Sequence, residues 1–233
     1  MKPLIYTYFV LFLFTSVCLA QSRTVQKNNM QWVQYYTTTH LNDDWYLQID
    51  GGYRLQNNFE DKVGYILRSA VAYQKTNKLS LAAGLGYLGN YSNDIFSRHE
   101  IRPHQEINYK TYWKQLKVSH RARIEERFLL NQNNANSFNV RFRYGLLFNY
   151  KLWNWNDDKN GLDLIFGNEL FLQAFNEKIN TTFQQNRFMV SPTFVFDNFS
   201  LGFTFTNQFT AISNGNYRKN NLIWLQIRHH FYR

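Results

Sequence analysis

The chain has 233 residues and carries 26 Lys and Arg against 16 Asp and Glu, which gives a formal net charge of +10. Its 11 Gly, 3 Pro and 1 Cys exclude collagen-like and disulfide-stapled folds, and its 44% apolar residues exclude a low-complexity disordered chain. The length favours one domain over two.

The first twenty residues have the pattern of a secretory signal peptide. Lys2 precedes an almost wholly apolar run over 4–17, and small residues at Cys18 and Ala20 suit cleavage before Gln21. The run is too short for a comfortable transmembrane helix. We therefore expect residues 1–20 to be removed and residues 21–233 to form a single exported domain without cysteine.

Polarity alternates with period two along most of the mature chain, which indicates β-strands. On residues 45–56 the odd positions from Trp45 onward are mainly apolar, and most even positions are polar. Eleven segments have this pattern: 31–41, 45–56, 63–74, 79–87, 98–109, 113–128, 138–148, 162–173, 184–196, 199–206 and 223–231.

Most of these segments have about ten or more residues, enough for a tilted strand to cross a bilayer. Short connections at 42–44, 75–78, 110–112 and 197–198 alternate with longer polar ones at 57–62, 90–97, 131–137, 176–183 and 213–220. The sequence thus predicts an all-β, closed, antiparallel outer-membrane β-barrel of ten to twelve strands. Because single-chain bacterial barrels have an even number of strands, we expect ten or twelve rather than eleven.

The charged residues share one face of successive strands. One face of the segment 98–109 contains Glu100, Arg102 and Glu106. The polar face of 113–128 contains Arg121 and Arg123. A charge facing lipid at mid-depth costs roughly 2–4 kcal/mol, so this face should point into the lumen. The predicted lumen charge network comprises Arg68, Glu100, Arg102, His104, Glu106, Arg121, Arg123, Glu125, Arg127, Arg141, Arg143, Glu169, Arg187 and Arg228.

Two interpretations of this network remain open. Paired arginines and carboxylates can fill a narrow barrel and satisfy one another, which makes a structural plug. The excess of bases over acids instead favours a basic constriction that passes or binds a small anionic solute.

The same residues resemble a known family. Trp45 with Arg54, Glu100-x-Arg102-Pro103-His104-Gln105, His120-Arg121-x-Arg123-x-Glu125-x-Arg127-Phe128 and Arg141-Phe142-Arg143-Tyr144 are similar to the small outer-membrane proteins catalogued as domain of unknown function 2490. The resemblance covers nearly all of the mature chain. It implies an outer-membrane barrel in Gram-negative bacteria and no established activity.

Catalytic and metal-binding motifs are not found in the sequence. Ser119 and His120 are adjacent, so they point to opposite faces of a strand and do not form the His and Ser pair of a barrel lipase. A pair of His104 with Glu100 or Glu106 offers acid–base chemistry, but no nucleophile accompanies it. We expect no catalytic residue, no metal site and no cofactor.

Three functions are compatible with the sequence. The first is an outer-membrane protein of structural or narrow-pore type, in contact with outer-membrane lipid and lipopolysaccharide and inserted by the outer-membrane assembly machinery. The second is a lipid-modifying or hydrolytic barrel enzyme. The third is a soluble periplasmic binder of lipocalin type. Export argues against a nucleic-acid partner despite the basic composition.

Overall fold

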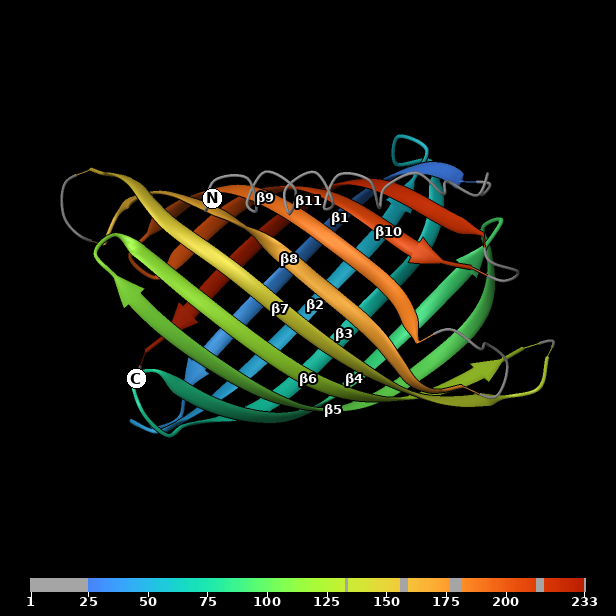
Figure 1. The fold of residues 1–233 in the computed structure, drawn as a ribbon, viewed down its shortest axis with the longest axis horizontal. Coiled ribbons are helices and arrows are strands. Elements are labelled where there is room, and N and C mark those ends of the chain that lie inside the picture. The colour runs from blue at the N-terminus through green and yellow to red at the C-terminus, as the bar shows by residue number, and fades with distance from the viewer. Residues whose placement is uncertain (1–24, 133, 156–158, 177–181, 213–215, 233) are drawn as a thin grey trace, which may run out of the picture.

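The chain forms a closed β-barrel, as expected from its period-two pattern (Figure 1). The computed structural model describes residues 25–132, 134–155, 159–176, 182–212 and 216–232; the predicted signal peptide lies outside these ranges. Within them, no helix is long and apolar enough to cross a membrane. The strands formed by the described residues are β1 Val25–His40, β2 Trp45–Gln56, β3 Asp61–Gln74, β4 Leu79–Ser92, β5 Ile95–Trp113, β6 Leu116–Asn131, β7 Ser137–Asn154, β8 Gly161–Asn176, β9 Phe183–Phe196, β10 Phe199–Ala211 and β11 Tyr217–Phe231.

The barrel closes through a parallel pair of strands. Each strand pairs antiparallel with its neighbours in sequence, but β1 and β11 run in the same direction, with Val25 opposite Tyr217 and Thr39 opposite Phe231. The described residues form eleven strands, which agrees with the predicted ten to twelve, but the expectation of an even number is wrong. An odd number of alternating strands leaves the first and last strands parallel, so this closing seam follows from the count.

The two ends of the barrel are here called the N-terminal rim, where β1 and β11 begin, and the C-terminal rim, where both end. The short turns predicted at 42–44, 75–78 and 197–198 lie at the C-terminal rim, and the first of them begins one residue earlier, at Leu41. The β5–β6 turn is at Lys114 and Gln115 rather than at 110–112, since the alternation continues through those positions.

One connection at the N-terminal rim is much shorter than predicted. Residues 90–97 were expected to form a long polar loop, but β4 and β5 extend into this range and leave only Asn93 and Asp94 between them. Their φ angles of 51° and 61° lie in the left-handed region that a two-residue hairpin of type I′ requires. Asn and Asp tolerate this backbone geometry, so polar composition here specifies a tight turn and not a loop.

The barrel wall has an apolar outside and a polar inside. All eleven strands in the described ranges have at least one large apolar side chain exposed outward, such as Leu67 on β3, Leu85 on β4 and Phe205 on β10. Most buried side chains are polar or charged, which places them inside the barrel. This is the reverse of a soluble globular domain, whose apolar side chains are buried.

A small apolar cluster interrupts the polar interior beside the closing seam. We call it the seam cluster: Met30, Trp32 and Leu222 are buried, and Val63 and Trp224 pack against them. In the parallel register Met30 lies opposite Leu222, and Trp32 lies opposite Trp224. The cluster covers the inside of the seam toward the N-terminal rim.

Candidate functional site

Four neighbouring strands place charged side chains on the inner face of one side of the barrel. Residues of even number on β5 and of odd number on β6, β7 and β8 point inward, because side chains alternate with period two along a strand. Adjacent strands lie about 5 Å apart, so arginines reach carboxylates across the ladder. The charged face predicted from the sequence is therefore brought together as one wall.

Glu125 lies at the centre of this wall. Its side chain is fully buried, and Arg143 Nη1 donates to its Oε1 at 2.6 Å. Arg141 Nε donates to Oε2 at 2.7 Å, and a second nitrogen of Arg141 contacts the same oxygen. Arg123 and Arg102 lie farther away, at 3.6 and 3.8 Å. One carboxylate is thus surrounded by four guanidinium groups.

Glu169 forms a second centre, which Arg143 links to the first. Arg121 lies at 2.5 Å from its Oε1 and Arg143 at 2.7 Å, while Arg187 reaches Oε2 at 3.5 Å. Arg143 therefore bridges Glu125 on β6 and Glu169 on β8 from its position on β7. Such charge-assisted pairs have fixed geometry and hold the three strands in register.

Two further glutamates complete the set. Glu100 accepts from Arg102 and Arg127, each at 2.6 Å, and Glu106 accepts from Arg123 Nε at 2.5 Å. All of these pairs connect to one another. We call the connected set the arginine network; its members among the described residues are Glu100, Glu106, Glu125, Glu169, Arg102, Arg121, Arg123, Arg127, Arg141, Arg143 and Arg187.

Three residues predicted from the sequence lie inside the barrel but outside this network. Arg68 pairs with Asp50 at 2.9 Å, and Arg228 lies over the ring of Tyr36 at 4.3 Å. His104 is buried, and no hydrogen bond joins it to Glu100 or Glu106 among the described residues. The acid–base pairs considered for His104 are therefore not formed.

The arginine network has three more arginines than glutamates. Burial in a confined interior strengthens the interaction between charges, so this excess creates a positive potential along the wall. Arg54 adds another positive charge on the inner face of β2, and no ion pair of the described residues includes it. These described side chains therefore give the interior an excess of positive charge.

Aromatic residues inside the barrel were not singled out from the sequence. Trp32 and Trp224 meet edge to face with ring centroids 5.2 Å apart, and Phe171 lies beneath Arg143 and Arg187 at 4.7 and 5.1 Å. The sequence does contain a sign that these tryptophans point inward. Trp32 lies on the same strand face as Gln34, and Trp224 lies on the same face as Gln226.

A cavity of about 790 Å³ runs along the interior beside the arginine network. Its lining includes Asn28 and Arg98 near the N-terminal rim, and Asp197 and Tyr232 at the C-terminal rim. The network thus lines the lumen and leaves space beside it. A smaller cavity of about 150 Å³ lies against Asp50, His104 and Glu106.

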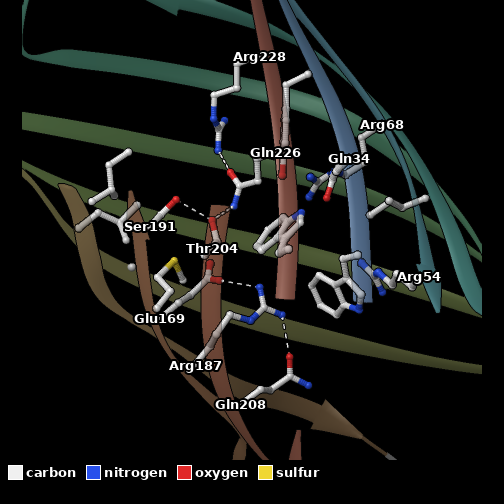
Figure 2. A pocket seen from close by; sticks show the side chains of 18 of the residues that line it. Gln34, Arg54, Arg68, Glu169, Arg187, Ser191, Thr204, Gln208, Gln226 and Arg228 are labelled. Atoms are coloured by element: carbon white, nitrogen blue, oxygen red, sulfur yellow. Dashed lines mark hydrogen bonds and ion pairs between the residues drawn. The ribbon is translucent and has the colours of Figure 1, made fainter. Parts of the chain in front are cut away.

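The opposite wall of the cavity contains a chain of neutral polar side chains. Gln226 donates to Thr204 at 2.9 Å and Thr204 to Ser191 at 2.8 Å, while Arg228 donates to Gln226 (Figure 2). Amides and hydroxyls both donate and accept, so this wall can form hydrogen bonds with donor groups and with acceptor groups of a solute. In the described parts of the chain, no group of three or more His, Cys, Asp or Glu side chains is arranged to hold a metal ion.

A family model matches residues 29–219, which is most of the chain. The chain belongs to the family described as Protein of unknown function (DUF2490). The resemblance drawn from the arginine-rich motifs is thereby confirmed. The matched region of this DUF2490 protein contains the whole arginine network and Trp32, but not Trp224 or Arg228. No curated protein matches the chain.

Proposed function

We propose that the chain is an outer-membrane β-barrel with a narrow, positively charged lumen that admits small anionic solutes. The observation that carries this proposal is the cavity, because its lining includes residues near both rims and most arginines of the network. A plug would fill the interior with paired charges. Here six arginines of the network line open space: Arg102, Arg121, Arg127, Arg141, Arg143 and Arg187.

The outer surface supports membrane insertion. Every strand of the described barrel exposes large apolar side chains, which in water would form an extended apolar surface. Exposed Trp45, Trp113 and Trp153 lie close to the C-terminal rim, where amphipathic rings suit the level of lipid headgroups. Strands of 12 to 19 residues are long enough to cross hydrocarbon at a tilt.

The location and partners follow from the same features. Residues 1–20 serve as the export signal, and Phe231, exposed at the end of β11, is offered to the outer-membrane assembly machinery. Exposed lysines and arginines of the rims contact anionic lipopolysaccharide. The cavity takes a small anionic solute.

Location is tested by cell fractionation and by gel mobility. The mature protein should be recovered with outer membranes, require detergent for extraction, and migrate differently with and without heating. Recovery in the soluble periplasmic fraction without detergent would instead support the soluble binder and contradict the proposal.

The pore itself is tested by reconstitution in planar bilayers. Small, uniform conductance steps are expected from the purified full chain, because the lumen is narrow. Insertion into the bilayer without any ion conductance would support a plugged, structural barrel and contradict the proposed pore.

A further inference from the structure

One region of the cavity carries positive charge that the arginine network does not balance. Arg54 on β2 lines the cavity, and its guanidinium carbon lies 4.5 Å from the ring centroid of Trp32. No ion pair formed by described residues includes Arg54. A guanidinium is always charged, so this position lacks a counter-ion in the barrel wall.

Arg187 on β9 reaches the same tryptophan. Its guanidinium carbon lies 5.2 Å from the ring centroid of Trp32 and 5.9 Å from that of Trp224. Its carboxylate partner, Glu169, is 3.5 Å away and holds Arg121 and Arg143 more closely. Two cations therefore lie against one indole. Of the two, only Arg187 has a carboxylate partner among the described residues, and it shares that carboxylate with two other arginines.

Hydrogen-bond donors without acceptors surround these cations. The indole N–H groups of Trp32 and Trp224, Nε of Arg187 and the amide nitrogen of Gln185 are buried and have no partner among the described residues. Leaving a buried donor unpaired is costly. All four groups donate, so they call for a hydrogen-bond acceptor, and beside two arginines the complementary acceptor is a negatively charged oxygen.

Neutral polar groups continue from this site along the cavity. Arg187 donates to Gln208 at 3.1 Å, and Ser191, Thr204 and Gln226 form the hydrogen-bonded chain of the opposite wall (Figure 2). Hydroxyl and amide groups match the hydroxyls of a sugar. The partly exposed ring of Trp224 offers a flat apolar surface to a sugar face.

From this combination we infer that the Arg54, Arg187, Trp32 and Trp224 region is a binding site for an anionic carbohydrate, either a sugar acid or a sugar phosphate. The carboxylate or phosphate lies between Arg54 and Arg187, and the hydroxyls contact the neutral wall. This inference rests on the proposed function, since it names the class of solute that the lumen admits.

Binding is measured by calorimetric titration of the detergent-solubilised full chain, which needs no conductance. The probes are glucuronate, glucose 6-phosphate, glucose and acetate. At least one of the two anionic sugars should bind about tenfold or more tightly than either glucose or acetate, a difference of about 1.4 kcal/mol. Comparing the two anionic sugars distinguishes a carboxylate from a phosphate as the charged group.

Variants locate the site. Arg54→Gln should weaken binding of the preferred anionic sugar about tenfold, and Trp224→Leu should weaken it while leaving acetate unchanged. Lys78→Gln removes the same charge from an exposed turn at the C-terminal rim and should leave binding unchanged. If Arg54→Gln does not fold, the comparison of probes on the unaltered protein decides, together with Arg54→Lys, which should retain part of the affinity.

Three results would overturn the inference: no binding of either anionic sugar, equal binding of glucose, or equal binding of acetate. Conductance, measured separately, tests the proposed pore independently of this binding site. A barrel that binds glucuronate but never conducts retains this site and loses the pore, whereas a conducting barrel without sugar binding retains the pore and loses the site.

Discussion

Arg143 donates to Glu125 at 2.6 Å from the neighbouring strand, and the carboxylate that it contacts is fully buried. In the ladder between β6 and β7, Glu125 lies opposite Arg141, so Arg143 reaches it on the diagonal. The second side of the Arg143 guanidinium contacts Glu169 on β8. This single side chain therefore ties three strands together and links two centres of the arginine network.

Replacing Glu125 with Gln should destabilise the barrel strongly. The substitution keeps the shape but removes the charge that four arginines share. Breaking a buried ion pair from one side costs roughly 3–5 kcal/mol, and we expect a loss in this range because the Glu125 carboxylate is fully buried. Unfolding by urea in detergent, followed by tryptophan fluorescence, measures the change.

The control for this variant is Glu60→Gln in the exposed β2–β3 connection, which removes the same charge. Its free energy of unfolding should stay within about 0.5 kcal/mol of the unaltered protein. Equal stability of the two variants would show that the buried network contributes little.

Replacing Gly84 with Ala should also destabilise the barrel, for a steric reason. An added Cβ would contact the backbone oxygen of Ser69 and lie 2.6 Å from Cβ of Ala70 on the neighbouring strand. Backbone atoms in a ladder cannot move aside without breaking its hydrogen bonds, so we expect a loss of about 1–3 kcal/mol. Gly51→Ala is the matched control, since its nearest atom would be 3.7 Å away, and it should be tolerated.

The parallel seam predicts that the start of β1 and the end of β11 lie on opposite sides of the membrane. Val25→Cys and Tyr232→Cys are exposed positions at the two rims. In intact cells a membrane-impermeant maleimide should label only one of them, and permeabilisation should expose the other. Labelling of both from the same side would mean an even number of spanning strands.

Reference positions make that labelling interpretable. Glu60→Cys lies at the same rim as Val25, and Thr76→Cys lies at the same rim as Tyr232. Each pair should behave alike, whichever rim faces outward.

Neighbouring residues of β10 test the assignment of faces. Phe203 is exposed outward and Thr204 is almost fully buried inside. In vesicles, Phe203→Cys should react with a lipid-phase probe, and Thr204→Cys should react only with a small water-soluble reagent. The reverse pattern would mean that the polar face contacts lipid.

The sequence predicts the barrel and the inner charged face because both depend on the same two-residue period. Arg121, Arg123 and Glu125 share a parity on β6, and only a lumen accommodates so many charges. Which strands are neighbours at the closure is not encoded in that period. The parallel pairing of Trp32 with Trp224 depends on the number of strands, and the expected even number gave the wrong topology.

The alternation is weaker on the first strand than on its neighbours, because Trp32 and Tyr36 point inward with Gln34 and reduce the contrast between its faces. For the same reason the sequence does not predict the aromatic part of the cavity around Trp32. In a period-two pattern, a tryptophan on the polar face is an exception to the alternation, and it gives no sign of a binding site. Individual partners within the network, such as Arg143 with both Glu125 and Glu169, depend on barrel curvature and are visible only in three dimensions.

The reversal potential across a planar bilayer shows whether the lumen is a narrow path with an excess of positive charge. With the full chain reconstituted between unequal potassium chloride solutions, the potential should have the sign that indicates preference for chloride, because arginines outnumber glutamates along the cavity. A potential that indicates preference for potassium, or bilayers that contain the protein and never conduct, would contradict the account.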